Sequence, residues 1–169
     1  MKGRKIFGDL VPYDQIWRTG ANNATNITFQ SDVKIEGQAL EAGTYALFTL
    51  PGKEEWTIIF NKNAKQWGAY TYDKADDVLR VKVKPRALTN PIETFTIAFE
   101  EVNDQNLKAC LLWEKTKVSF LIEVDQKAEI LASIDEAMRG EKKPYFQAAQ
   151  YYYTHGLDIK KAAEWMVEA

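Results

Sequence analysis

Apolar and polar positions alternate along many short stretches of the first 124 residues. Residues 43–50 and 56–61 are mostly apolar at both alternating positions, which is typical of strands covered on both faces. Pro51 and Gly52 lie between them, and this pair suits a tight turn because proline presets φ and glycine tolerates a positive φ. The two stretches therefore predict an antiparallel hairpin whose first strand is central in a sheet.

Further stretches show the alternation expected of half-buried strands. Residues 36–38 and 103–106 are turn-like, and Pro85 ends one strand because it cannot donate to a ladder. The predicted strands cover residues 25–35, 78–84, 94–99, 107–114 and 115–124. About seven or eight short strands with frequent turns predict a mainly β chain. An antiparallel β-sandwich is favoured over a barrel because no glycine pattern repeats from strand to strand.

The spacing of apolar residues becomes helical after residue 124. One helix is predicted between residues 125 and 139, ended by Gly140. Residues 144–169, from Pro144 to Ala169, predict a helical hairpin resembling one tetratricopeptide unit, with Asp158 capping its second helix. The residues at helical spacing in the first helix are Phe146, Ala149, Gln150 and Tyr153, and the small residues Ala148, Ala149, Ala162 and Ala163 are expected to permit close contact between the helices. The domain prediction is a β-sandwich over residues 1–124 and a C-terminal helical segment over residues 125–169.

Composition narrows the function classes. The 22 basic and 24 acidic residues give a net charge of −2, which does not favour nucleic acid as a partner. No apolar run approaches the ~18 residues of a membrane span, and we expect no signal peptide at the start of this chain. The single cysteine, Cys110, excludes an internal disulfide framework, and its apolar neighbours predict a buried structural thiol.

Catalytic and metal-binding patterns are not recognisable in the sequence. The only histidine, His155, stands at a predicted helix end, where it suits the helix dipole better than a catalytic triad. Asp73, Asp76 and Asp77 form the densest acidic group, and we interpret them as a solvated turn because calcium-loop spacing is missing. The sequence therefore predicts no catalytic residues, no metal ligands and no cofactor.

Two groups of residues are candidates for ligand binding. The irregular but apolar segment of residues 1–24 is expected to pack over a sheet end, and a second aromatic loop follows residue 61. Arginine offers a planar fork for a carboxylate or phosphate, and polar donors beside flat aromatic faces suit a sugar. The candidates are Trp17, Arg18 and Asn22 in the first group and Asn61, Gln66, Trp67 and Tyr70 in the second.

Structural roles compete with this interpretation. Arg18 could cap exposed carbonyls or pair with an acid, and Trp67 could plug the end of the sandwich. A meeting of the two loops at one end of the sheet would favour binding.

Several motifs carry a family resemblance. WRTGAN at residues 17–22, AGTYALFTLPG at 42–52, EWTIIFNK at 55–62, QWGAY at 66–70 and DDVLRV at 76–81 resemble a bacterial family common in Bacteroidetes, catalogued as domain of unknown function 2911. The resemblance covers roughly residues 2–124 and implies a β-rich, exported and periplasmic protein. Family members usually carry an export signal and further strand-forming residues before the KGRKIFG segment. Both are missing here, so we expect a trimmed chain, in which a missing strand would leave one sheet edge exposed. The resemblance implies no established activity or catalytic residues.

Taken together, the residues and the resemblance predict a non-catalytic module of the bacterial envelope that binds a small ligand or glycan. One alternative is a protein-interaction module that docks through the helices of residues 144–169. Another alternative is a hydrolase whose site the sequence does not reveal.

Overall fold

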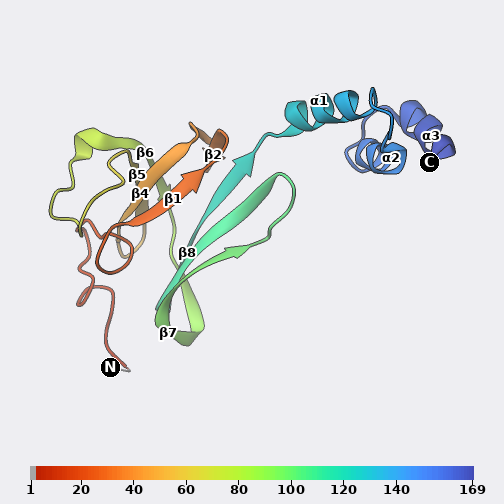
Figure 1. The fold of residues 1–169 in the computed structure, drawn as a ribbon. Coiled ribbons are helices and arrows are strands. Elements are labelled where there is room, and N and C mark those ends of the chain that lie inside the picture. The colour runs from red at the N-terminus through yellow and green to blue at the C-terminus, as the bar shows by residue number, and fades with distance from the viewer. Residues whose placement is uncertain (1–2) are drawn as a thin grey trace. The chain divides into compact units, whose positions relative to one another are not determined.

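The computed structural model describes residues 3–169 of the chain. The chain forms two compact units, residues 1–124 and residues 125–169. The first is built from strands and the second from helices (Figure 1).

Eight strands of the described chain form two four-stranded sheets with antiparallel pairing. The first sheet has the order β1-β4-β5-β6, and its strands are β1 (Thr25–Phe29), β4 (Gly43–Leu50), β5 (Trp56–Asn61) and β6 (Asp77–Val83). The second has the order β3-β2-β8-β7, and its strands are β2 (Val33–Ile35), β3 (Gln38–Leu40), β7 (Arg86–Glu100) and β8 (Asn106–Val124).

The main hydrophobic core lies between the two sheets. Buried residues of β4, β5 and β6 share one cluster with buried residues of β2, β3 and β8. Phe60 of the first sheet meets Phe120 of the second edge to face, with ring centroids 5.9 Å apart. Aromatic pairs of this geometry add to the apolar burial that holds two sheets together. The fold is therefore the predicted antiparallel β-sandwich with a C-terminal helical appendage.

The β4–β5 hairpin confirms the strongest sequence pattern. β4 is central, with Tyr45 and Leu47 in the main core and Ala46 and Phe48 in a second, smaller cluster on the outer face. A Cβ atom on Gly52 would lie 2.2 Å from the carbonyl oxygen of Glu55, so the close backbone approach, and not the expected positive φ, requires glycine there.

The single strand predicted for residues 25–35 is wrong, because the chain crosses between sheets within it. Phe29 ends β1 in the first sheet, and Val33 begins β2 in the second. Residues 30–32 make the crossing, where the Asp32 carboxylate accepts a hydrogen bond from the Ala42 amide at 2.8 Å. Alternation of apolar residues continues through the crossing, so the pattern could not reveal it.

The last two predicted strands are the arms of β8, within which the backbone reverses direction. A straight strand of 19 residues would span about 60 Å. Instead, the amide of Val124 donates to the carbonyl of Gln105 at 2.7 Å, and Glu114 near the middle has a φ of 52°. The predicted strands of residues 107–114 and 115–124 therefore correspond to the two halves of β8 (Figure 1).

β7 begins earlier than predicted. The sequence indicated residues 94–99, whereas the strand runs from Arg86 to Glu100 with shifts of pairing register between Ala87 and Thr96. These irregularities surround Pro91, which cannot donate to a ladder, so regular alternation is lost in the first half of the strand.

Three helices form the second unit: α1 (Lys127–Ala137), α2 (Tyr145–Thr154) and α3 (Ile159–Glu168). Asp158 caps α3 as predicted, because its carboxylate accepts from the amides of Lys160 and Lys161. No helix among residues 3–169 has the length and apolar character needed to cross a membrane.

The stripe predicted for α2 is correct at Ala149 and wrong at Phe146 and Tyr153. Phe146 and Tyr153 are exposed, and the buried face of α2 carries Ala148, Ala149 and Tyr152. Small alanines permit close approach of α3, and the Tyr152 ring meets Trp165 edge to face at 4.9 Å. Apolar residues lie on two faces of α2. The face with the smaller residues is buried because it allows closer packing against α3.

Candidate functional site

The N-terminal segment contributes to the core of the sandwich, where Phe7 and Trp17 belong to the main cluster. Trp17 extends the sheet beside β1: its amide donates to the carbonyl of Thr49, and its carbonyl accepts from the amide of Thr49. Its indole ring lies among Phe7, Phe95 and Trp113, with centroid distances of 5.0 to 6.2 Å. Trp17 is therefore buried within an aromatic cluster.

Residues 18–24 leave this sheet edge and return to it. Trp17 pairs with Thr49 and Thr25 pairs with Leu47, so the edge bulges outward between two nearby positions of β4. The bulge is closed at its base, where the Thr25 amide donates to the carbonyl of Arg18 and the Thr25 hydroxyl donates to the carbonyl of Thr19. We call residues 18–24 the edge loop.

The edge loop meets the aromatic loop, which we define as residues 62–72. Asn23 and Trp67 form an isolated antiparallel bridge. The amide of Ala24 donates to the carbonyl of Gln66, and the amide of Gly68 donates to the carbonyl of Asn22, each at 3.0 Å. The two predicted groups of residues therefore come together.

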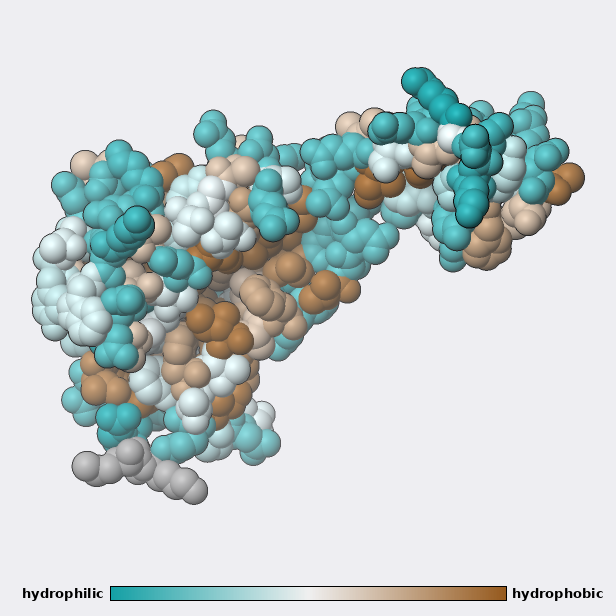
Figure 2. Space-filling model, in the orientation of Figure 1, coloured by the Kyte–Doolittle hydropathy of each residue, from teal (hydrophilic) through white to brown (hydrophobic). Residues whose placement is uncertain are grey.

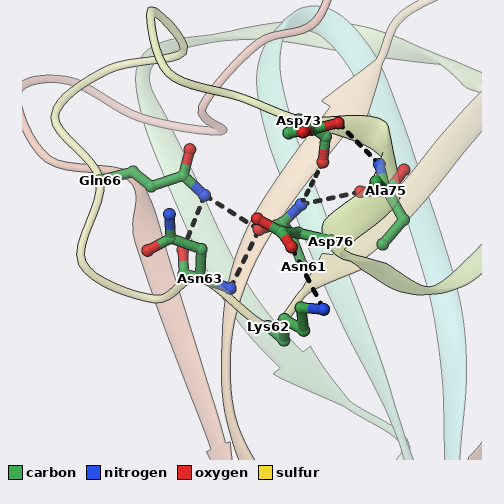
Figure 3. A network of polar contacts seen from close by, with 8 residues as sticks. Asn61, Lys62, Asn63, Gln66, Asp73, Ala75 and Asp76 are labelled. Carbon is green, nitrogen blue, oxygen red and sulfur yellow. Dashed lines mark hydrogen bonds and ion pairs between the residues drawn. The ribbon is translucent and has the colours of Figure 1, made fainter.

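A buried polar network around Asn61 holds the aromatic loop (Figure 3). The Asn61 amide nitrogen donates to the carbonyl of Asp73 at 3.1 Å and to the Asp77 carboxylate at 2.9 Å. The Asn61 side-chain oxygen accepts from the amide of Asn63 and from the side chain of Gln66. Asn61 thus uses both donors and both acceptor positions of its amide, and none is left for a ligand.

The acidic turn contributes to this network, which the sequence did not reveal. The Asp77 side chain is only 4% exposed and accepts from the Tyr72 hydroxyl at 2.6 Å and from Arg80 at 2.7 Å. The pKa of Tyr72 is raised to about 12, first by burial and then by its hydrogen bond to Asp77. The interpretation of Asp77 as part of a solvated turn is wrong, because β6 begins at this residue and a register shift at Phe60 and Asn61 changes the pairing there.

Sequence reasoning missed Tyr72, Asp77 and Arg80 as members of this network. A carboxylate at the first position of an apolar strand was the available signal, because a buried charge requires a partner. The partner residues themselves could not be identified without the pairing of β5 with β6.

Two aromatic rings remain exposed on the aromatic loop. The Trp67 side chain is 61% exposed and that of Tyr70 is 85% exposed. Gly68 lies between them with a φ of 65°, and a Cβ atom there would lie 2.8 Å from the Tyr70 ring. The Tyr70 ring therefore rests against the Gly68 backbone. Asn22, across the bridge, is also exposed.

Arg18 differs from the other predicted residues. Its Nε atom is enclosed by protein atoms and has no hydrogen-bond partner, and its guanidinium forms no ion pair with residues 3–169. Ile16 packs on the outer cluster and Trp17 in the main core, so alternation directs Arg18 to the outer face. Ala69 and Tyr72 of the aromatic loop cover that same face.

The seven predicted site residues thus fall into three groups. Trp17, Asn61 and Gln66 are buried, whereas Asn22, Trp67 and Tyr70 are exposed. Arg18 lies between these extremes. A role in ligand binding remains a prediction for all of them.

Metal-binding and thiol chemistry add little to the site. Within residues 3–169, no group of three or more histidine, cysteine, aspartate or glutamate side chains could hold a metal ion. Cys110 is buried, as predicted, and burial raises the pKa of its thiol.

Comparisons with known proteins identify a family. The comparison with curated proteins and the comparison with solved structures each returned no match. A family model described as "Protein of unknown function (DUF2911)" matches residues 1–122, which cover nearly all of the sandwich unit. This chain therefore belongs to the DUF2911 family.

Proposed function

We propose that Asn22, Trp67 and Tyr70 form a flat platform on which a sugar ring stacks, and that the domain is a non-catalytic glycan-binding module. One observation carries the proposal: two large aromatic rings stay exposed on a loop that is otherwise tightly held. Exposed aromatic groups on a fixed frame are characteristic of recognition surfaces.

The frame supports binding because it limits the entropy lost when a ligand docks. Gln66 precedes Trp67 and is fixed by hydrogen bonds from its side-chain nitrogen to Asn61 and to the carbonyl of Asn63. The bridge to Asn23 holds the backbone of Trp67 itself. A ring presented in this way needs little rearrangement to stack on a sugar.

Arg18 supports an acidic sugar as the ligand. A buried guanidinium nitrogen without a partner costs stability, and alternation directs the Arg18 side chain toward the face that the aromatic loop covers. A carboxylate from the ligand would pair with the exposed part of this guanidinium. We therefore expect oligosaccharides with a carboxylate, including muropeptides, to bind more tightly than neutral ones.

A thermal-shift screen of oligosaccharides, muropeptides and small carboxylates tests the proposal. A ligand at about 100 times its Kd should add about 2.7 kcal/mol of stability. The shift should be lost in Trp67→Ala and Tyr70→Ala and retained in Tyr153→Ala, which removes another largely exposed ring, on α2. The proposal fails if Tyr153→Ala and Tyr70→Ala respond alike.

We propose the helical unit as a second candidate, a docking surface for another protein. Figure 2 shows apolar side chains at its surface, and five of them are exposed: Phe146, Tyr153, Ile159, Met166 and Val167. Scattered apolar residues are common on surfaces, but five within two short helices support a contact. Deleting residues 125–169 should abolish partner binding and leave glycan binding intact. The reverse result would assign glycan binding to the helical unit and partner binding to the sandwich unit.

We also propose that the domain acts in the bacterial envelope. The proposal rests on the family resemblance of the motifs between residues 17 and 81. Fractionation of the source cells should place the protein outside the cytoplasm, and recovery from the cytoplasmic fraction would contradict it.

A further inference from the structure

A groove with a basic lining lies on the sandwich unit, among residues of β6, β7 and β8. Its volume is about 380 Å³, within the range of small-ligand sites. The lining includes five basic and three acidic side chains, a formal charge of +2 on a protein whose net charge is −2. None of the groove residues belongs to the platform or its polar network.

The acidic side chains of the groove are already engaged. Glu100 pairs with Lys117 at 2.5 Å, and Glu101 pairs with Lys108 at 2.6 Å. Glu36 accepts a hydrogen bond from the amide of Leu121. The carboxylates therefore neutralise only part of the basic lining.

Two cations of the groove lack a carboxylate partner. Neither Lys84 nor Arg86 forms an ion pair with any described residue of the chain, and the two stand on either side of Pro85. Both side chains line the same groove. One ligand group could therefore contact both side chains.

The strand register adds an independent observation. Arg86 on β7 lies directly opposite Lys117 on β8. Like charges at directly opposite positions destabilise a sheet. The hydrogen bond from Lys117 to Glu100 raises the pKa of Lys117, whereas the positive charge of Arg86 lowers it. An added anion would therefore reduce the electrostatic repulsion between Arg86 and Lys117.

We propose that this groove binds a small molecule that carries a phosphate group. Arg86 provides a planar fork for two phosphate oxygens, and Lys84 provides a second positive charge beside it. The hydroxyl of Ser119, which also lines the groove, can donate to a third oxygen. The phosphate dianion matches the two cations that no carboxylate neutralises.

Titration of the full chain with glucose 6-phosphate tests this proposal. The melting temperature is followed for the wild type, for Lys84→Gln/Arg86→Gln, and for Lys53→Gln/Lys142→Gln. The last variant removes two exposed positive charges elsewhere. Glucose with sodium chloride at equal ionic strength controls for the sugar and for screening.

We expect glucose 6-phosphate to raise the melting temperature of the wild type and of Lys53→Gln/Lys142→Gln. Lys84→Gln/Arg86→Gln should bind about tenfold more weakly or worse, because two charge-assisted hydrogen bonds are lost. No shift in the wild type, or an equal shift in all three proteins, overturns the proposal. An equal shift with succinate also overturns it, because the groove would then select dicarboxylates rather than phosphate.

Discussion

Asn61 shows how one residue can link a strand to the aromatic loop. Its backbone pairs within the first sheet. Its side chain forms hydrogen bonds with Asp73 in the turn, with Asp77 at the start of β6 and with Gln66 in the aromatic loop. Without the Asn61 amide, the buried carboxylate of Asp77 and the buried side chain of Gln66 would each lose a hydrogen bond. The orientation of the aromatic loop therefore depends on a side chain that no ligand can reach.

Replacing Asn61 with alanine should lower the free energy of unfolding by about 2–3 kcal/mol, because Asp77 and Gln66 each lose a buried hydrogen bond and a cavity is left. Asn63→Ala is the matched control, since the Asn63 side chain is exposed and only its backbone joins the network. We expect a change within about 0.5 kcal/mol for the control. Urea unfolding measures the stability of both variants. Equal losses of stability would show that the Asn61 side chain does not hold the network together.

Tyr72 should give the protein a distinct dependence on alkaline pH. Its pKa rises from 10.0 in the unfolded chain to about 12 in the folded protein. A raised folded-state pKa means that the stabilisation is complete below pH 10 and is lost as the pH rises toward 12. We therefore expect the wild type to lose more stability than Tyr72→Phe between about pH 9 and 11.5.

Unfolding free energies measured across that pH range make the comparison. Tyr45, whose pKa is also raised, is present in both proteins, so its contribution cancels in the difference. Parallel curves for the wild type and Tyr72→Phe would show that the Asp77 contact does not hold the hydroxyl.

At the scale of elements, the decisive feature is the meeting of two loops from different parts of the chain. The edge loop leaves the sheet beside β4, and the aromatic loop connects β5 to the short 3₁₀ helix at Lys74–Asp76. Their backbone bridge extends hydrogen bonding beyond the regular sheet. Trp67 is consequently presented from two paired segments rather than from a free loop.

Gly68 should be more sensitive to substitution by alanine than Gly37. Gly68→Ala introduces strain at a positive φ and a contact of 2.8 Å with the Tyr70 ring. Gly37→Ala, in the turn between β2 and β3, introduces only the first effect because nothing lies within 4 Å of its Cβ position. The φ strain alone costs about 1–2 kcal/mol.

Chemical denaturation of the two variants separates these effects. We expect Gly68→Ala to be the more destabilised protein and to change the environment of the Tyr70 ring, seen in its NMR signals. Equal destabilisation, with unchanged Tyr70 signals, would mean that the ring does not rest on Gly68.

At the scale of the whole molecule, the sequence patterns predicted those structural features that are set by residues close together in the chain. The β4–β5 hairpin followed from Pro51 and Gly52, and the cap of α3 followed from Asp158. The crossing at residues 30–32 was missed because alternation does not record which sheet a strand joins. The buried position of Asp77 was missed because it depends on the register of β5 against β6.

The candidate site was predictable only in part for the same reason. The sequence identified the aromatic and amide residues of both loops, and it anticipated that their meeting would favour binding. It could not separate exposed Trp67 from buried Trp17, because the burial of Trp17 comes from Phe7, Phe95 and Trp113, far apart in the chain. Long-range packing thus decides which aromatic side chains a ligand can reach.

The measurement that tests the glycan platform most directly is a titration followed by the indole NH signals of the five tryptophans. Each signal is assigned from a Trp→Phe variant, and the ligand is a carboxylate-bearing oligosaccharide found in the thermal-shift screen. We expect the chemical shift of the Trp67 indole NH to change with added ligand, whereas the shifts of the buried Trp17 and Trp56 stay constant. A Trp67 signal that stays unchanged at saturating ligand would contradict the platform.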